Sequence, residues 1–354
     1  MRRCDVLVVG AGAMGSATAW QLARQQADVV LLEQFGQGHL RGSSHGATRI
    51  FRFSYAWPEY VAMAKAALPH WRELEDDADE PLLDITGGLD IGAPALIAPI
   101  AEALEANGAA FEQLGEADVA ERWPGLAVNS DDAVLYSPDG GRLWADRSVA
   151  ALQRRAAHYG AEVRYDERVL SVDANAGTAA TDVETYEADA IVVTAGAWLA
   201  DLVAGSGADA TLPPLRVTRE QTFHFPPLDD DVAWPSFIHH RGDEQALVYG
   251  LETPGEGIKV AEDHAGPETD PDDRSFVVDE IGRQRVIRYV TERLPGLDPT
   301  PVTELTCLYT STPDGAFVLE RHGRLVIGSP CSGHGFKFTP LIGRILADLA
   351  TKPG

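Results

Sequence analysis

The first 35 residues of the chain switch between two hydrophobic patterns. Continuous apolar runs at residues 5–9 (DVLVV) and 28–33 (DVVLLE) predict two buried strands. Between them, GAGAMG predicts a glycine turn, and SATAWQLARQQ continues as a helix rich in small residues. The apolar run near Met1 ends at the glycines, so we interpret it as a strand and not as a signal peptide.

Further strands and helices follow in two later parts of the chain. Residues 188–203 (ADAIVVTAGAWLADLV) and 324–350 each predict a strand, a loop of small residues and a helix. Shorter strand-like runs, such as EQTFHF and ALVYGLETPGEGIKV, lie in the segments between. We therefore predict an α/β fold in which a Rossmann-like domain is interleaved with a second, β-rich domain. The expected boundaries are 1–80, 145–215 and 300–354 for the first domain, and 81–144 and 216–299 for the second.

The glycine turn has the spacing of a dinucleotide-binding fingerprint. Gly10, Gly12 and Gly15 follow one predicted strand and begin a helix, and Glu33 ends the next strand. Glycines allow the backbone to approach a pyrophosphate at the helix N-terminus, and the acid can accept a hydrogen bond from a ribose hydroxyl. This context predicts dinucleotide binding, but it does not separate FAD from NAD.

The charge balance excludes one class of partner. The 54 acidic and 29 basic residues give a net charge of −25, and lysines are scarce among the basic residues. Phosphate binding needs a basic face, so we do not expect nucleic acid as a partner. An acidic, lysine-poor surface is typical of proteins from salt-loving organisms, where concentrated cations screen repulsion between carboxylates. An ordinary acidic protein is the alternative.

Composition also bears on the compartment. Three cysteines are too few for a disulfide framework and lack metal-ligand spacing, so we expect a reducing cytoplasm and no metal site. The sequence has no run of about 18 or more apolar residues, so we expect no membrane span.

The segment GHLRGSSHGATRIFRF follows the second predicted strand, where ligands bind in such folds. Ser43 or Ser44 is expected to cap a helix on which Arg49 and Arg52 share a face. In one interpretation, His45 and the two arginines face a cofactor or an anionic substrate. In the other, they are solvated side chains of a surface helix.

Two lysines and one cysteine are of interest because their residue types are scarce in this chain. Lys259 and Lys337 lie beside glycine loops (GEGIK and SGHGFK), where a lysine supplies a compact charge whose pKa shifts on burial. Chance retention of the two lysines is the alternative. Cys307 begins CLYTSTPDG, and composition allows it to be either a small core residue or a reactive thiol.

The chain resembles the monomeric sarcosine oxidase and N-methyltryptophan oxidase family of FAD-dependent amine oxidases. The resemblance rests on motifs that run in order along the chain: GAGAMGS, GSSHGATRIFR, VVTAGAW, the segment around GIKV, CLYTSTPD and SGHGFKF. It implies an FAD-binding domain and a substrate domain built on an antiparallel β-sheet. It also implies that oxygen oxidises a secondary (N-methyl) amino acid such as sarcosine to an amino acid, an aldehyde and hydrogen peroxide.

The resemblance implies a role for each matching residue. Cys307 matches the cysteine joined to the 8α-methyl of the flavin, and Lys259 matches the lysine near flavin N5 that promotes reaction with oxygen. Lys337 and Arg52 match the pair that binds the substrate carboxylate. The further catalytic candidates are His45 and Arg49, near the flavin ring, and Tyr249, whose spacing differs by about a residue from that of a family active-site tyrosine. The cofactor-binding candidates are Gly10, Gly12, Gly15, Glu33, Ser43, Ser44, Thr48, Gly196, Cys307, Gly333, Gly335 and Lys337.

Two features depart from the family pattern. Family members often have a histidine four residues after the oxygen-activating lysine, whereas this chain has Asp263 there and His264 next. Either a local shift places His264 in the active site, or Asp263 changes the charge and the substrate preference of the pocket. The chain also ends at Gly354, soon after the last predicted helix, and we expect the fold to tolerate loss of a peripheral segment.

Other functions stay open at this point. A dehydrogenase, or an oxidase of another amino acid, would use the same scaffold. A flavin-carrying subunit without turnover or an NAD-dependent enzyme would share the fingerprint. We expect a monomer or small homo-oligomer whose partners are the amino acid substrate and molecular oxygen.

Overall fold

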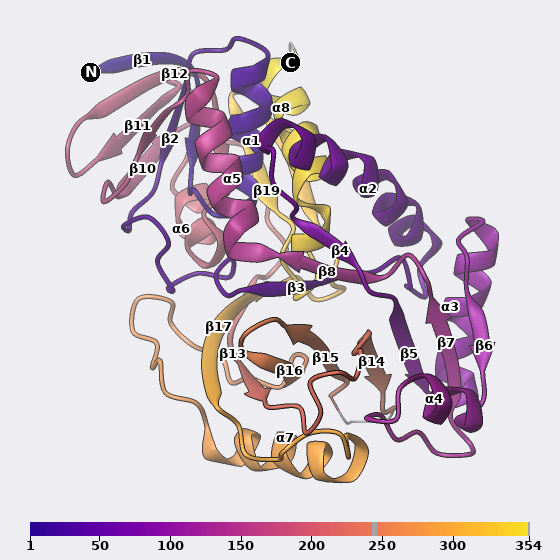
Figure 1. Ribbon diagram of the computed structural model, residues 1–354. Coiled ribbons are helices and arrows are strands. Elements are labelled where there is room, and N and C mark those ends of the chain that lie inside the picture. Colours follow the sequence, from indigo (N-terminus) through magenta and orange to yellow (C-terminus); the bar gives the residue numbers. More distant parts are fainter. Residues whose placement is uncertain (243–245, 353–354) are drawn as a thin grey trace.

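Two eight-stranded sheets form the frame of the protein, and a three-stranded sheet lies between them (Figure 1). The computed structural model describes residues 1–242 and 246–352. The fold is a mixed α/β fold, as the sequence predicts, with one largely parallel and one largely antiparallel sheet.

The first sheet has a parallel centre in the order β12-β1-β2-β9, with β19 paired in parallel to β12. Its antiparallel strands are β10 and β11 on one side and β18 beside β19. The strands are β1 (Arg2–Val9), β2 (Val29–Leu32), β9 (Glu162–Arg164), β10 (Val169–Asp173), β11 (Thr178–Thr181), β12 (Thr185–Val193), β18 (Val318–His322) and β19 (Leu325–Ser329).

Helices cover both faces of this sheet, which explains why its central strands are continuously apolar. Val6 and Val8 of β1 pack on one face with the long helices, and Leu7 and Val9 pack on the other face with α6. The tight fit of α1 against α8 depends on small residues, since a Cβ at Gly343 would lie 2.5 Å from Cβ of Ala17. The helices are α1 (Ala13–Arg24), α2 (Pro58–Ala78), α5 (Ala145–His158), α6 (Leu199–Ala204) and α8 (Thr339–Thr351), with short 3₁₀ turns η1 (Gly196–Trp198) and η2 (Phe336–Phe338).

The second sheet runs in the order β17-β13-β16-β15-β14-β5-β7-β6, and its strands are antiparallel except where β5 meets β14. One face packs on α7 through a core that includes Phe223, Val248 and Val260. The elements are β5 (Gly88–Gly92), β6 (Glu112–Leu114), β7 (Ala133–Ser137), β13 (Arg216–Phe225), β14 (Ser236–His240), β15 (Val248–Thr253), β16 (Gly257–Glu262), β17 (Thr303–Ser311), α3 (Pro94–Ala106), α4 (Glu116–Arg122) and α7 (Glu280–Arg293).

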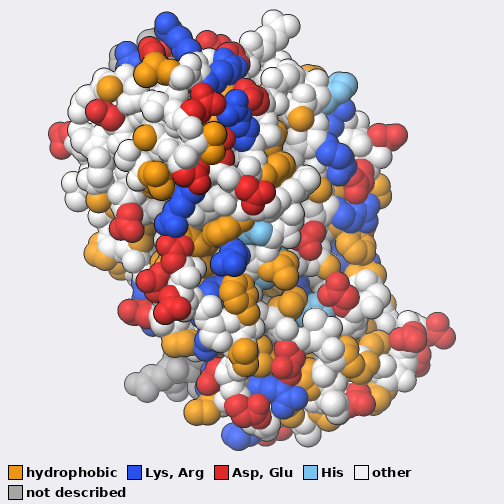
Figure 2. All heavy atoms as spheres, turned by 90° about the vertical axis from the view of Figure 1, so that its left-hand side faces the viewer, with side chains coloured by type: hydrophobic (Ala, Val, Ile, Leu, Met, Phe, Trp, Pro, Cys, Tyr) orange, Lys and Arg blue, Asp and Glu red, His pale blue; other side chains and the backbone are white. Residues whose placement is uncertain are grey.

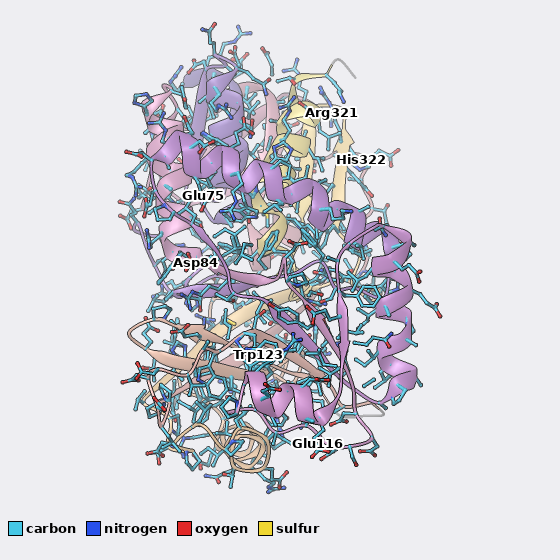
Figure 3. The ribbon with its side chains drawn as sticks, turned by 45° about the vertical axis from the view of Figure 1, so that its right-hand side comes forward. Glu75, Asp84, Glu116, Trp123, Arg321 and His322 are labelled. Carbon is cyan, nitrogen blue, oxygen red and sulfur yellow. The ribbon has the colours of Figure 1, made fainter. Side chains whose placement is uncertain are left out.

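A small sheet of β3 (Thr48–Phe51), β8 (Gly141–Trp144) and β4 (Leu83–Ile85) connects the two larger ones. The Asp84 carboxylate accepts hydrogen bonds of 3.0 Å from Arg142 Nε and from Trp144 Nε1, which fixes β4 against β8. Glu75 of α2 accepts from the backbone amides of Leu82 and Leu83 at 2.7 and 2.9 Å. Figure 3 shows both carboxylates where α2 passes over this sheet.

The prediction of a helix after Ser43 and Ser44 is wrong. Thr48–Phe51 is the strand β3, in which Arg49 lies opposite Leu143 of β8. A Thr-Arg-Ile-Phe run favours a strand when a partner strand is present, because β-branched and aromatic residues suit a pleated surface. Ser44 still caps a helix, but that helix is α1: its Oγ accepts a hydrogen bond of 3.0 Å from the Ala13 amide.

The surface carries both signs of charge. Figure 2 shows acidic side chains spread over one face, with lysine and arginine between them. The preference for concentrated salt stays a prediction, which a comparison of melting curves in dilute buffer and in molar KCl will check. Among residues 1–242 and 246–352, no helix is long and apolar enough to cross a membrane.

Candidate active site

A cavity of about 1190 Å³ lies between the first sheet and the inner face of the second. The carboxyl ends of β1 and β2 open into it, as expected of ligand sites in such sheets. The antiparallel sheet contributes every second residue of its strands: Leu247, Tyr249 and Leu251; Lys259; Leu305, Cys307 and Tyr309. The cavity exceeds the roughly 300–1,000 Å³ of ordinary small-molecule sites, which suits a cofactor together with a substrate.

The nucleotide end of the cavity is built from close backbone contacts. Gly10 has φ 96°, and a Cβ on it would lie 2.7 Å from the Thr194 carbonyl oxygen. A Cβ on Gly15 would overlap the Gly10 carbonyl oxygen, and one on Gly12 would lie 3.0 Å from Ser44 Oγ. Gly10 and Gly15 are therefore required by the packing against backbone atoms, and Gly12 lines the cavity at the N-terminus of α1.

Glu33 lies at the same end, just after β2, and is buried. Its two carboxylate oxygens accept hydrogen bonds from the amides of Ala11 at 2.9 Å and Phe35 at 3.1 Å. The carboxylate is thus held in one orientation, with His39 Nε2 3.4 Å from Oε1, while Oε2 keeps a lone pair for another donor. A buried acid presented in this way fits the ribose hydroxyls of a dinucleotide.

The loop after β2 and the start of β3 bring two polar side chains, His45 and Arg49, into the cavity. Arg49 donates to the Ser43 and His45 carbonyl oxygens at 3.0 and 2.6 Å, which holds the loop in place. Burial, reinforced by the Arg49 charge, lowers the pKa of His45 to about 3, so its ring is neutral. Both ring nitrogens of His45 lack a hydrogen-bond partner among the residues that the structure describes. Buried polar atoms without partners fit a site built to receive a polar ligand such as a flavin ring.

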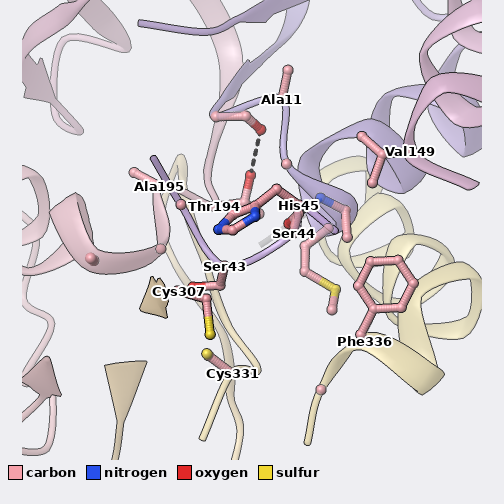
Figure 4. Close-up of a pocket in the computed structure, with 18 of the residues that line it drawn as sticks. Ala11, Ser43, Ser44, His45, Val149, Thr194, Ala195, Cys307, Cys331 and Phe336 are labelled. Atoms are coloured by element: carbon pink, nitrogen blue, oxygen red, sulfur yellow. Dashed lines mark hydrogen bonds between the residues drawn. The ribbon is translucent and has the colours of Figure 1, made fainter. Parts of the chain in front are cut away.

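Cys307 projects into the same region as His45 (Figure 4). Cys307 lies on β17 opposite Glu220 of β13, and its side chain points toward the cavity. Burial raises the pKa of its thiol to about 11, and the Arg49 charge acts in the opposite direction. Cys331 lines the cavity beside it, and its sulfur accepts a bond of 3.4 Å from the Thr310 amide.

Lys259 lies on β16, and only 4% of its surface is exposed. Its ammonium donates a hydrogen bond of 2.8 Å to the Thr48 carbonyl oxygen, and Thr48 Oγ1 lies 2.7 Å from Thr253 Oγ1. Burial lowers the pKa of Lys259 to about 7, and the Arg49 charge adds to this effect. A lysine so placed can carry or release a proton near neutral pH.

Lys337 and Arg52 meet at the ring of Tyr55. The Arg52 guanidinium lies 4.1 Å and the Lys337 ammonium 5.4 Å from the ring centroid. Lys337 donates to the His334 carbonyl oxygen at 2.7 Å, and its burial, with the Arg52 charge as the next cause, lowers its pKa well below the usual range. The positive charges of the partly buried Arg52 and the buried Lys337 repel each other, so the pair favours an anionic ligand.

The structure distinguishes Asp263 from His264. Asp263 follows β16 directly and lines the cavity, whereas the His264 ring packs against the edge of Tyr309 with a centroid distance of 5.2 Å. His264 adopts a left-handed backbone with φ 56°, and its side chain is 43% exposed. Of these two residues, Asp263 therefore lines the active-site cavity.

The remaining candidates lie around the cavity. Ser43, Thr48, Gly196, Gly333 and Gly335 all line it, as does Tyr249. Tyr55 and Tyr309 are residues that sequence reasoning missed. Tyr309 could have been found from the period of a strand, because it lies two residues after Cys307 and faces the same side. Tyr55 had no such signal, since it lies in irregular structure after β3.

Comparison with known proteins places this site in a family. Residues 5–349 match the family described as FAD dependent oxidoreductase. Peroxisomal sarcosine oxidase of Homo sapiens is 33% identical over 369 residues, covering 98% of this chain and 92% of that protein. Monomeric sarcosine oxidase of Bacillus sp. (strain B-0618) is 31% identical over 363 residues, with 98% of this chain and 92% of the relative covered.

A solved structure has the same fold and related sequence. NikD, an amino acid oxidase essential for nikkomycin biosynthesis, superposes with a TM-score of 0.89 at 29% identity, covering 99% of this chain and 95% of NikD. The L-proline dehydrogenase of P. horikoshii, at 20% identity and a TM-score of 0.87, shares the fold. Together with a cavity that fits a dinucleotide and a flavin, these matches show that the chain belongs to the FAD-dependent oxidoreductase family, as an amine oxidase acting on CH–NH donors.

Proposed function

We propose that the protein oxidises a secondary (N-methyl) amino acid such as sarcosine, giving the amino acid, an aldehyde and hydrogen peroxide. The observation that carries this proposal is the pair of basic side chains, Arg52 and Lys337, beside Tyr55 and in the same cavity as Lys259. The names of the relatives, which include sarcosine oxidases and an N-methyl-L-tryptophan oxidase, support the choice of substrate class.

The cation pair binds the substrate carboxylate in this proposal. Arg52 offers a planar fork of N–H donors and Lys337 a point charge, and Lys337 loses little water on binding because it is already buried. Bound FAD supplies the redox chemistry by accepting a hydride equivalent from the carbon next to the amine. The protein contributes the position of that carbon and the charges around it.

Lys259 is proposed as the cation that assists the reaction with oxygen. Its hydrogen bond to the Thr48 carbonyl oxygen holds the ammonium in place, and the side chain is buried. A fixed cation in a buried site stabilises negative charge that develops during electron transfer to oxygen. His45 and Arg49 are proposed to contact the flavin ring, because they lie in the cavity between the glycine turn and Lys259.

Cys307 is proposed as the covalent attachment point of FAD. Attachment would remove the thiol hydrogen and one hydrogen of the flavin 8α-methyl group together with two electrons, which oxygen takes up as hydrogen peroxide. The position of Cys307 on the cavity face supports this role, and the Arg49 charge opposes the rise in the pKa of the thiol that burial causes.

A denaturing gel tests the attachment. The wild-type band is expected to fluoresce as a flavin, whereas Cys307→Ser should release FAD on denaturation. Cys331→Ser is the matched control, since it removes the neighbouring thiol in the same cavity and should keep the fluorescent band. A fluorescent Cys307→Ser band would place the attachment elsewhere.

Anaerobic mixing with N-methyl amino acids tests the reaction itself. The flavin absorbance is expected to bleach, and admission of air should restore it with formation of hydrogen peroxide. A flavin that stays yellow would indicate a non-catalytic carrier. Bleaching without peroxide would favour a dehydrogenase.

A further inference from the structure

Asp263 is a carboxylate that lines the same cavity as the basic side chains of Arg52, Lys259 and Lys337. Lys259, Ala261 and Asp263 are spaced by two along β16 and its extension, and both charged residues line the cavity. The Asp263 amide donates to the Leu247 carbonyl oxygen at 2.9 Å, which continues the β15–β16 ladder by one step. The backbone at Asp263 is therefore fixed, and its side chain is aimed into the cavity by the sheet.

The groups around Asp263 leave its charge only partly compensated. The nearest basic group in ion-pair range is His264, whose Nε2 lies 3.7 Å from Asp263 Oδ2 on the more exposed side. The other ionisable groups whose charges act on Asp263 are the phenols of Tyr249 and Tyr55, the cations of Arg52 and Lys337, and the carboxylate of Glu220, and the Tyr309 hydroxyl is a hydrogen-bond donor to it. Burial is the main reason why the pKa of Asp263 is raised above its usual value.

The charges in this part of the cavity are complementary to those of a zwitterion. Arg52 and Lys337 together attract an anion, and the Asp263 carboxylate attracts a positive charge at another point of the same cavity. A simple carboxylate satisfies the first requirement alone. An amino acid with a protonated nitrogen satisfies both, because its two charges are joined by a single carbon.

We propose that Asp263 is the subsite for the positively charged nitrogen of the substrate, so that the site selects zwitterionic amino acids over carboxylates of the same shape. This inference rests on the proposed function and names the part of the cavity that recognises the amine. Asp263 acts as a positioning residue: it accepts a charge-assisted hydrogen bond and orients the nitrogen relative to the clamped carboxylate.

Two ligands of equal shape isolate the charge. Trimethylglycine carries a permanent positive nitrogen, and 3,3-dimethylbutanoate has a carbon in its place. Both are titrated into the holoenzyme, with the flavin absorption spectrum as the reporter, at one pH and one salt concentration. Wild type is expected to bind trimethylglycine at least about tenfold more tightly, since a nearby opposite charge outweighs the lost hydration at a partly buried site.

Asp263→Asn is expected to abolish this preference while it keeps the size of the side chain. Asp270→Asn is the matched control, because Asp270 also lines the cavity but lies in a different loop, and it should keep the preference. Arg52→Ala should weaken both ligands by the same factor. Loss of carboxylate binding at Arg52 is thereby distinguished from loss of the charge preference at Asp263.

The pH dependence of anaerobic flavin reduction gives a second, independent readout. A carboxylate next to the bound ammonium favours its protonated form, so Asp263→Asn should move the rise in reduction rate to lower pH by about one unit. If Asp263 had only a structural role, the pH at which the reduction rate rises would not change. Equal binding of the two ligands by wild type, or a preference that survives in Asp263→Asn, would overturn the proposal. Bleaching by N-methyl amino acids is scored separately, so the proposed function can hold when this inference fails.

Discussion

The two ends of the cavity are built on different principles. At the nucleotide end, Gly10 and Gly15 create space by having no side chain, and the backbone itself faces the ligand. At the reactive end, Lys259 and Lys337 are long charged side chains with 4% and 5% of their surfaces exposed. The first end depends on steric fit, and the second depends on charges that are held out of water.

This contrast explains which part of the site tolerates change. A steric site fails completely when an atom is added, because backbone atoms that already touch cannot move apart cheaply. In a charged site, each cation assists one stage of the proposed reaction. Removal of one cation therefore impairs that stage and leaves the others in place. Buried lysines with lowered pKa values also cost stability, and such groups are typical of functional sites.

The largest effect is expected at the nucleotide end. Gly15→Ala places a Cβ on the Gly10 carbonyl oxygen, so FAD binding should be lost and the purified protein should be colourless. Gly36→Ala is the matched control in the same region, because its Cβ would lie 3.7 Å from Asp166, an ordinary contact. Flavin absorbance per protein and circular dichroism distinguish loss of cofactor from loss of fold. A yellow Gly15→Ala protein would show that the turn adjusts.

A large but incomplete loss of substrate affinity is expected from changes to Arg52, which we propose binds the substrate carboxylate together with Lys337. Arg52→Ala should weaken the binding of carboxylate-bearing substrates by roughly 30- to 100-fold, since hydrogen bonds to charged groups contribute about 2–3 kcal/mol. Arg52→Lys should fall between this variant and wild type, because it keeps the charge but loses the fork. Substrate titration under anaerobic conditions measures the affinities. Unchanged affinity in Arg52→Ala would place the anion site elsewhere.

The same contrast decides what the sequence could predict. The strand, glycine turn and helix at the nucleotide end are local, so their pattern identified both the fold and the fingerprint. The reactive end is assembled from β3, β15, β16, β17 and η2, and its packing is not visible in any one segment. The segment after Ser44 was expected to be a helix because the strand partner β8 lies far away in sequence. The choice between Asp263 and His264 depended on whether β16 continues in register past Glu262, since the two-residue period from Lys259 then directs Asp263 into the cavity.

A narrower effect is expected from Lys259. Lys259→Met should slow reoxidation of the flavin by about 10- to 1,000-fold while flavin reduction changes much less, because the ammonium stabilises charge only in the oxygen reaction. Stopped-flow mixing of each half-reaction measures the two rates separately. Similar losses in both would contradict the assigned role. Lys337→Met is the complementary variant, because its loss should appear in substrate binding.

The smallest effect concerns stability without the cofactor. The pKa of Lys259 is about 7 in the folded protein, compared with 10.5 for an ordinary lysine. Between these values the unfolded chain binds a proton that the folded protein does not, so the free energy of unfolding should rise with pH across this window. Below about pH 7, the folded protein bears the full cost of the buried charge. Lys337, whose pKa is also lowered, contributes with the same sign.

Urea unfolding of flavin-free protein from pH 7 to pH 10 measures this contribution. Lys259→Met should reduce the rise by up to roughly 1.4 kcal/mol per pH unit, the value for one proton, and it should be more stable than wild type at pH 7. Lys352→Met removes an exposed lysine at the end of α8 and should leave the slope unchanged. An unchanged slope in Lys259→Met would mean that water reaches the ammonium in the absence of FAD, and that the cofactor itself completes the burial of the reactive end.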